Sequence, residues 1–529
     1  MQVNSKKFIV LHPILIALFP VFLVYYQNIH LLLLQGLIFP ALIILSVSIA
    51  LWYVIKIILK NTIKSALLSS LYIFLFFSYG HVIIIIQSNL TQEFAIPIHA
   101  ILLISYTVFV VLGTYYIVKT NRKLNNLTTI ANAMSITALV FVFFNIGIYN
   151  FENSNYNFQA ENFNPIVLGN DFKKTPDVYY IIMDEYAPLG TLERFYDYDN
   201  SDFIKFLEER GFYVTKNSHS NYAQSATSIS SALNMKYLNN LPAVVGNESK
   251  DQRFLYQMLD NNLVMRNFKS AGYQVYNFDS GAWSTRSLNI ADENLCSKNQ
   301  TADFRTLYQV KQTSILRALD IFIKEPTSRI FHQEHRDRIH CQFSEITEIK
   351  QRTEEPVFVF MHVLSPHDPF VFGPNGEEVD YKFTFGPGVI TPFEPTFDLA
   401  LTSNERIKAY RDQVIYLTKI LRQTVDKLLE NSDNPPIIII QSDTGPNVSF
   451  SDITKEGSHV GRMSIFNAYY FPNKEYNLLY NDITPVNSFR IVFDSQFQTN
   501  YGLLEDKVFF STYEKPYTFI EITDFSIVR

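Results

Sequence analysis

Acidic and imidazole side chains follow three short apolar runs of the sequence, and they are the residues best suited to chemistry. Asp184 and Glu185 end the run DVYYIIMDE, His362 and His367 stand at and just after the end of PVFVFMH, and Asp443 ends PIIIIQSD. Carboxylate oxygens and imidazole nitrogens are common ligands of divalent metals. A metal held by such groups promotes phosphoryl or sulfuryl transfer, because it stabilises the charge that develops on the transferred group.

A hydroxyl-rich segment lies between the first two of these runs. It reads QSATS over Gln224–Ser228, at the predicted start of a helix, and offers Ser225 and Thr227 as nucleophiles. A Ser or Thr hydroxyl is a poor nucleophile near neutral pH, but metal coordination lowers its pKa. A helix N-terminus also favours an anionic substrate. Small hydroxyl residues commonly begin helices for structural reasons alone, so the residues by themselves do not choose between a structural and a catalytic role.

The three apolar runs have the length and the β-branched and aromatic content of buried strands. Strands are predicted at 177–184, 356–362 and 436–443, and helices at 202–210, 224–235 and 404–431. Strands that alternate with helices predict an α/β domain with a largely parallel central sheet and helices on both faces. Sites in such sheets form at the carboxyl ends of strands, which is where the candidate residues lie.

The N-terminal part of the chain predicts a bundle of five transmembrane helices. A membrane-crossing helix needs about 20 mostly apolar residues. The windows that qualify are Phe8–Tyr26, Leu31–Ile55, Ser65–Gln87, Ile98–Val118 and Thr128–Tyr149. No Asp, Glu, Lys or Arg lies within these spans, so a transporter is disfavoured and an anchor is favoured.

The short loops carry positive charge on one side only, which predicts the orientation. The basic residues of that side are Lys6, Lys7, Lys56, Lys60, Lys64, Lys119, Arg122 and Lys123. The positive-inside rule places the N-terminus in the cytoplasm of a bacterial-type inner membrane, and five spans bring all later residues to the other face. We expect an anchor over 1–150, a surface linker over 151–175 and an extracytoplasmic domain over 176–529.

Charge and cysteine content add two constraints. The formal net charge of the 529 residues is -6, and no dense basic stripe is visible, so nucleic acid is not an expected partner. The chain has two cysteines, Cys296 and Cys341, whose spacing fits no zinc motif. They form either one disulfide or two free thiols.

The order of these motifs resembles the alkaline phosphatase and sulfatase superfamily. The resemblance rests on DE after a strand, a hydroxyl nucleophile at a helix start, SPHDPF after a second strand and QSDTG after a third. With the five-span anchor, the chain is similar to lipoteichoic acid synthases, phosphoethanolamine transferases and bacterial membrane proteins with a sulfatase-like domain. Similar runs include DNSDFIKFLEERGFYV, SNYAQSATSISSALNMKYL, FVFMHVLSPHDPFVF and PVNSFRIVF.

The resemblance implies roles for single residues. Asp184, Glu185 and Asp443 match metal-ligand positions, and the nucleophile, itself a metal ligand, is commonly followed by Ser three positions later. Ser225 meets that spacing through Ser228 and is favoured, while Thr227 meets it equally through Ser230. His367 matches a histidine that contacts the phosphate or sulfate group. His362 is expected to assist it, and His459 in GSHVGR is a further candidate for substrate binding.

One position departs from the superfamily pattern. Asp443 is followed by Thr444, where the superfamily usually has a metal-binding histidine. A hydroxyl is a weaker ligand for zinc than imidazole but can serve magnesium, calcium or manganese, so the metal identity stays open. Three readings follow: a changed metal preference, a nitrogen supplied by another residue such as His459, or loss of activity.

The leading expectation is a metal-dependent transferase. It moves a phosphate-linked group, of the phosphoethanolamine or phosphoglycerol type, from a phospholipid donor to an envelope glycan or lipid acceptor. A degenerate sulfatase-fold protein that acts in polysaccharide binding or assembly is the alternative from another class. A sulfatase or phosphodiester hydrolase is a further alternative, although SATSI lacks the Pro or Ala and the Arg of the sulfatase maturation pattern.

Overall fold

The computed structural model of the chain comprises two compact units, which are described separately. The described residues are 9–29, 34–87, 95–152, 175–282, 284–297, 310–318, 326–379, 403–430, 434–447, 461–513 and 515–523. Most of the predicted linker at 151–175 and the candidate His459 lie outside these residues.

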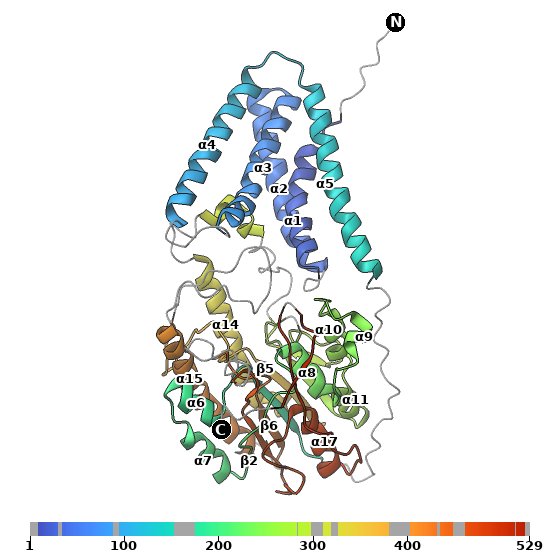
Figure 1. The fold of residues 1–529 in the computed structure, drawn as a ribbon, viewed down its shortest axis with the longest axis vertical. Helices are drawn as coiled ribbons and strands as arrows, with labels where there is room; N and C mark the ends of the chain where they lie inside the picture. Colours follow the sequence, from blue (N-terminus) through green and yellow to red (C-terminus); the bar gives the residue numbers. More distant parts are fainter. Residues whose placement is uncertain are drawn as a thin grey trace. The chain divides into compact units, whose positions relative to one another are not determined.

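The first unit contains five N-terminal helices (Figure 1). They are α1 His12–Gln27, α2 Ile38–Leu59, α3 Thr62–Gln87, α4 Ala95–Lys119 and α5 Asn125–Glu152, with a 3₁₀ turn, η1, at Leu34–Leu37. Among the described residues, four helices are long and apolar enough to cross a membrane, namely α2 to α5. The helix in the first predicted span, α1, has 16 residues and is shorter than the other four. The number of spans therefore stays a prediction.

The second unit is built on a seven-stranded sheet with the strand order β2-β7-β6-β1-β5-β3-β4. The pairs β1–β5, β1–β6, β3–β5 and β3–β4 are parallel, whereas β7 pairs antiparallel with β6 and β2 at one edge. The strands are β1 Val178–Met183, β2 Tyr213–Val214, β3 Gln274–Phe278, β4 Glu293–Leu295, β5 Val357–Val363, β6 Ile437–Gln441 and β7 Asn467–Tyr470. The predicted, largely parallel α/β sheet is confirmed.

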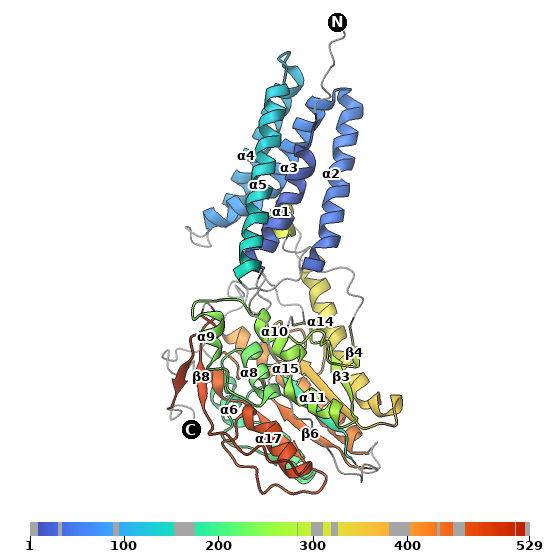
Figure 2. The same cartoon turned by 90° about the vertical axis from the view of Figure 1, so that its right-hand side faces the viewer.

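Helices cover both faces of this sheet (Figures 1 and 2). They are α6 Leu189–Tyr196, α7 Ser201–Glu209, α8 Ser225–Asn234, α9 Leu241–Val245, α10 Arg253–Asp260, α11 Leu263–Ser270, α14 Pro326–Glu345, η5 Ile346–Arg352, α15 Ser403–Glu430 and α17 Pro485–Gln496. A short hairpin of β8 Val508–Phe510 and β9 Ile520–Ile522 lies outside the main sheet. The helices predicted at 202–210, 224–235 and 404–431 correspond to α7, α8 and α15.

The central strand β1 separates two hydrophobic cores. Its alternate residues Tyr179, Ile181 and Met183 belong to the core with α7 and α15, while Val178, Tyr180 and Ile182 belong to the core with α8, α11 and α17. Successive side chains of a strand point to opposite faces, so a strand buried on both faces has no polar alternation. This burial explains the continuous apolar run VYYIIM. Because β1 is the fourth of the seven strands, the residue that follows it lies among the central strands.

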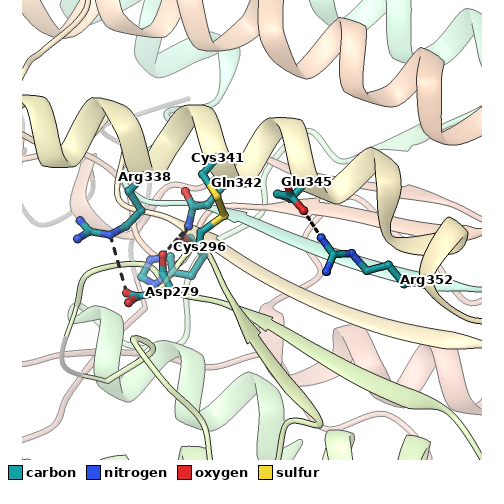
Figure 3. Close-up of a disulfide and its surroundings, with 8 residues drawn as sticks. Asp279, Cys296, Arg338, Cys341, Gln342, Glu345 and Arg352 are labelled. Atoms are coloured by element: carbon teal, nitrogen blue, oxygen red, sulfur yellow. Dashed lines mark hydrogen bonds and ion pairs between the residues drawn. A yellow bond between two sulfur atoms is a disulfide. The ribbon is translucent and has the colours of Figure 1, made fainter. Parts of the chain in front are cut away.

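Cys296 and Cys341 form a disulfide, which resolves the alternative that the sequence left open (Figure 3). The bridge joins the residue after β4 to helix α14. The next residue of α14, Gln342, donates hydrogen bonds to the carbonyl oxygens of Asp279 (3.2 Å) and His362 (2.9 Å). The disulfide thus lies beside the contact that ties α14 to the ends of β3 and β5.

Replacing both Cys296 and Cys341 with Ser is expected to lower the free energy of unfolding of this unit by about 2–4 kcal/mol, because a cross-link restricts the unfolded chain. Denaturant unfolding of the full chain in detergent, followed by circular dichroism, measures the loss. The parent protein should lose the same amount after reduction. Detection of two free thiols in the native, unreduced parent would contradict the assignment.

Candidate active site

Three ligand groups converge at the carboxyl ends of the central strands. Asp184 directly follows β1, His362 is the sixth residue of β5, and Asp443 lies two residues after β6. Since β5 and β6 flank β1 on its two sides and run parallel to it, their carboxyl ends meet at one edge of the sheet. The backbone N–H of Asp184 donates to the carbonyl of Val363 at 2.9 Å, which extends the ladder to the site itself.

The geometry of this trio fits a metal site. Asp184, His362 and Asp443 are buried, and each offers a ligand atom within 4.8 Å of the others. His362 Nε2 lies 3.6 Å from Asp184 Oδ2. Both Asp184 oxygens, Asp443 Oδ2, His362 Nε2 and the Thr444 hydroxyl are buried without a hydrogen-bond partner among the described residues. Buried polar atoms are normally satisfied, so a cluster of unsatisfied acceptors indicates a place for a cation.

The nitrogen of the trio comes from His362 and not from position 444. The sequence predicted His362 as an assisting catalytic residue and Thr444 as a metal ligand. His362 Nδ1 lies 2.8 Å from the Thr285 hydroxyl, which lies 2.7 Å from the Ser280 hydroxyl. If Nδ1 carries the proton and donates it to Thr285, the lone pair of Nε2 faces the two carboxylates. Such outer hydrogen bonds fix the tautomer of a metal-binding histidine.

The two candidate nucleophiles have different surroundings. Ser225 is the first residue of α8, is partly exposed, and its side chain interacts with the carboxyl group of Asp443. Thr227 is fully buried, and its hydroxyl donates to the carbonyl of Gln224 at 2.9 Å. The Ser228 hydroxyl donates to the Asp443 carbonyl at 2.7 Å and joins α8 to the end of β6. Ser225 is therefore the candidate hydroxyl that adjoins the buried acids.

Glu185 faces a neighbouring network of charges. The trio does not include it, and its carboxylate pairs with Arg462 and lies 3.7 Å from His367 Nε2. Its φ of 62° places a non-glycine residue in the left-handed region, a strained conformation that clusters at functional sites. Burial raises the pKa of Glu185, while the charges of His367 and Arg462 oppose that shift.

Arg462 is the site residue that the sequence did not indicate. The guanidinium donates to the carbonyls of Ala223 (2.9 Å) and Gly445 (3.1 Å) and contacts the Tyr513 hydroxyl at 3.4 Å. Its side chain is only 11% exposed. It therefore joins the residues just before α8 to those just after β6. The signal in the sequence was weak: one arginine at the end of GSHVGR, before a buried apolar segment.

His367 is held as a cation. Its Nδ1 lies 2.6 Å from the Asp368 carbonyl and 3.0 Å from Asp368 Oδ1. Burial lowers the pKa of His367, but the carboxylates of Glu185, Asp368 and Asp184 outweigh burial and raise the pKa well above its ordinary value. At neutral pH this imidazolium can bind an anionic group or donate a proton.

Of the two carboxyl groups in the trio, Asp443 has a raised pKa and Asp184 a lowered one. Burial, followed by the negative charge of Asp184, raises the pKa of Asp443 to about 7. Two carboxylates that share a buried site do not both ionise easily, and a bound cation relieves that repulsion. Near neutral pH, a proton and a metal ion would therefore compete for Asp443.

Comparison with known protein families identifies a match, which covers the part of the chain that carries the site. The profile of the sulfatase family matches residues 176–503. No curated protein has significant sequence similarity to the chain.

Solved structures with detectable similarity have low identity to the chain. The integral membrane lipooligosaccharide phosphoethanolamine transferase A from Neisseria meningitidis is 12% identical, with a TM-score of 0.40 over 92% of this chain and 96% of that chain. The periplasmic domain of EcEptC from Escherichia coli is 11% identical, with a TM-score of 0.40 over 68% and 96%. The phosphonate monoester hydrolase of Agrobacterium radiobacter is 12% identical, with a TM-score of 0.38 over 64% and 80%.

The family profile alone spans more than half of the chain. Within residues 176–503 it includes β1, β5 and β6, the three strands whose ends carry Asp184, His362 and Asp443, and the start of α8 with Ser225. On this match, the chain is a member of the sulfatase family.

Proposed function

We propose that this protein is a membrane-anchored, metal-dependent transferase of phosphate-linked groups. The observation that carries the proposal is the buried trio of Asp184, His362 and Asp443 next to the Ser225 hydroxyl. The donor is a phospholipid with a head group of the phosphoethanolamine or phosphoglycerol type. The acceptor is a hydroxyl of an envelope glycan or lipid.

The ligand set supports a divalent cation of intermediate softness. Two carboxylates and one imidazole suit zinc or manganese better than calcium, which prefers oxygen ligands alone. A cation bound there would lower the pKa of the Ser225 hydroxyl and stabilise negative charge on the transferred group. We propose Ser225 as a fourth ligand because its side chain interacts with Asp443.

The chain's own residues supply the remaining roles. Ser225 Oγ attacks phosphorus as the alkoxide that a bound cation would favour, the bond from phosphorus to the lipid glycerol oxygen breaks, and the imidazolium of His367 gives the leaving diacylglycerol its proton. Arg462 and the start of α8 contact the non-bridging phosphate oxygens, which carry the charge. An acceptor hydroxyl then attacks phosphorus, loses its proton to His367, and releases Ser225.

The position of His362 argues against a degenerate fold. Loss of the histidine at position 444 favours that alternative only if no other imidazole replaces it. His362 provides a buried nitrogen within 4.8 Å of both carboxylates. A protein without chemistry would gain nothing from two buried carboxylates, since they destabilise the folded state when unpaired.

We also propose the five-span topology with a cytoplasmic N-terminus, an anchor over 1–150 and a catalytic domain over 176–529 in the extracytoplasmic space. Helix α1 contacts α2, α3 and α5, and its residues Ala17 and Val21 are fully buried. A helix packed in this way among longer apolar helices is expected to cross with them. The disulfide supports an oxidising compartment for the catalytic domain.

Ser225→Ala is expected to abolish the covalent phospho-enzyme and to reduce turnover by more than about a thousandfold, because no hydroxyl remains to attack phosphorus. Intact-protein mass spectrometry and transfer from fluorescent phosphatidylethanolamine or phosphatidylglycerol measure the two effects. Thr227→Ala is the matched control and should keep the adduct. An adduct that survives in Ser225→Ala and disappears in Thr227→Ala would assign the nucleophile to Thr227.

His362→Gln is expected to weaken binding of zinc or manganese by about a hundredfold or more, since it removes the nitrogen ligand. Thr285→Val should weaken binding by about tenfold, because it removes only the hydroxyl that orients the ring. Isothermal titration of the metal-free protein measures both affinities. His340→Gln, at an exposed histidine of α14, is the control and should leave the affinity unchanged. Equal affinities in all four proteins would exclude His362 as a ligand.

The metal affinity should fall by about tenfold for each pH unit below 7, because a proton on Asp443 competes with the metal. In the metal-free protein, the contribution of Asp443 to the free energy of unfolding has the opposite pH dependence and decreases as the pH rises. The pKa of Asp443 is raised from 3.8 to about 7, so its contribution to the free energy of unfolding is lost as the pH rises between those values. Chelator competition and denaturant unfolding across this range measure the two trends. Metal affinity that does not change between pH 7 and pH 5.5 would contradict this assignment.

A further inference from the structure

A segment far beyond the N-terminal helices belongs to the same compact unit as those helices. Residues 310–318, which end in the 3₁₀ turn η4 at Ile315–Ala318, pack against α3. Val310, Gln312, Thr313 and Ser314 are all buried. The helical unit is therefore completed by residues that follow β4 in the sequence.

Gly80 is the contact point on α3. Its backbone N–H donates to the Thr313 carbonyl at 3.0 Å. A Cβ at this position would lie 2.2 Å from the Gln312 carbonyl oxygen and 2.5 Å from Thr313 backbone atoms. Only glycine permits that approach, so the segment occupies a specific docking position on the helix.

The docked segment brings a cation to a polar cluster. Tyr79, the neighbour of Gly80, has its hydroxyl 2.7 Å from His99 Nδ1 on α4, and both residues are buried. Arg317 of η4 lies close enough to interact electrostatically with both. Ile315 and Ala318 pack in the same hydrophobic cluster as Tyr79, which holds the turn in place.

A second hydroxyl pair extends this cluster. The Ser78 hydroxyl lies 3.0 Å from the Tyr106 hydroxyl, and the rings of Tyr79 and Tyr106 meet edge to face at 5.5 Å. The Ser78–Tyr106 pair therefore lies beside the Tyr79–His99 pair, with which Arg317 interacts. That composition is suited to an anion with several oxygens.

The depth of the cluster agrees with the outer half of the membrane. Tyr79 is eight residues from the end of α3 at Gln87, or about 12 Å along the helix, and His99 is four residues from the start of α4 at Ala95, or about 6 Å. These ends lie opposite to the ends marked by Lys64 and Lys119. An arginine at such a depth marks a functional site by default, because it is costly to keep in an apolar region.

We propose that Arg317, Tyr79 and His99 form a binding site for the phosphodiester of a glycerophospholipid in the outer leaflet. The guanidinium forms paired hydrogen bonds to two phosphate oxygens. The hydrogen-bonded Tyr79–His99 pair supplies one further donor, which is the Tyr79 hydroxyl when His99 Nδ1 donates to it and His99 Nε2 when His99 Nδ1 accepts from it. The acyl chains lie along the apolar surfaces of α3 and α4. The inference requires the membrane topology proposed above but not the chemistry at Ser225.

Native mass spectrometry of the full chain in detergent tests the site, with phosphatidylglycerol and phosphatidylethanolamine as probes and diacylglycerol as the probe without phosphate. The parent should retain both phospholipids and not diacylglycerol. Arg317→Gln should weaken phospholipid binding by about tenfold or more, and Tyr79→Phe by about threefold, since a charged and a neutral hydrogen bond are lost. All proteins carry Ser225→Ala as well, so that binding is measured without turnover.

Arg122→Gln is the matched control, because it removes one exposed positive charge at the other end of the bundle. It should leave binding unchanged. Equal losses in Arg122→Gln and Arg317→Gln would reduce the effect to general charge attraction and overturn the site. If Arg317→Gln fails to fold, Arg317→Lys decides, because it keeps the charge and loses the paired geometry. Parent-like binding in Arg317→Lys and Tyr79→Phe would overturn the proposal.

Discussion

Two carboxylates are buried side by side just beyond the carboxyl ends of two central strands, and the surrounding structure compensates for their charge. Asp184 and Asp443 end adjacent parallel strands, so the fold itself forces them together. Like charges in a dry environment repel strongly. The imidazolium of His367, the guanidinium of Arg462 and the start of α8 all face this region, and each supplies positive charge or positive potential. Substrate anions would meet the same groups.

The compensating groups come from distant parts of the chain. Arg462 lies just before β7, joins segments next to α8 and β6, and pairs with Glu185 beyond β1. The negative charges of Glu185, Asp368 and Asp184 raise the pKa of His367 and so favour its imidazolium form. The ion pairs and the pKa shifts of these residues depend on one another. Changes to single residues in it are therefore expected to be strongly non-additive.

The local features of the fold were predictable, and the long-range ones were not. The runs that form β1, β5 and β6 are almost entirely apolar because both faces of each strand are buried, so the sequence pattern alone located them. The antiparallel strand β7, NAYY, is short and has no such pattern. The position of Arg462 and the approach of His362 to the two carboxylates depend on contacts among segments that are distant in the sequence, and the Cys296–Cys341 bond depends on the packing of α14. Thr444 departs from a motif at a visible position of the sequence, whereas the nitrogen of the buried trio lies on another strand, at His362.

The contact between Gly80 and Thr313 constrains the order in which the parts of this protein can fold and pack during synthesis. Helix α3 is synthesised long before Thr313, so its packing surface around Gly80 stays uncovered until residues 310–318 have been made. Strands β1 to β4 of the second unit come next in the sequence, and only then do residues 310–318 complete the helical unit. Synthesis of the two units is therefore interleaved, and a fragment over residues 176–529 would carry residues 310–318 without the α3 surface that covers them.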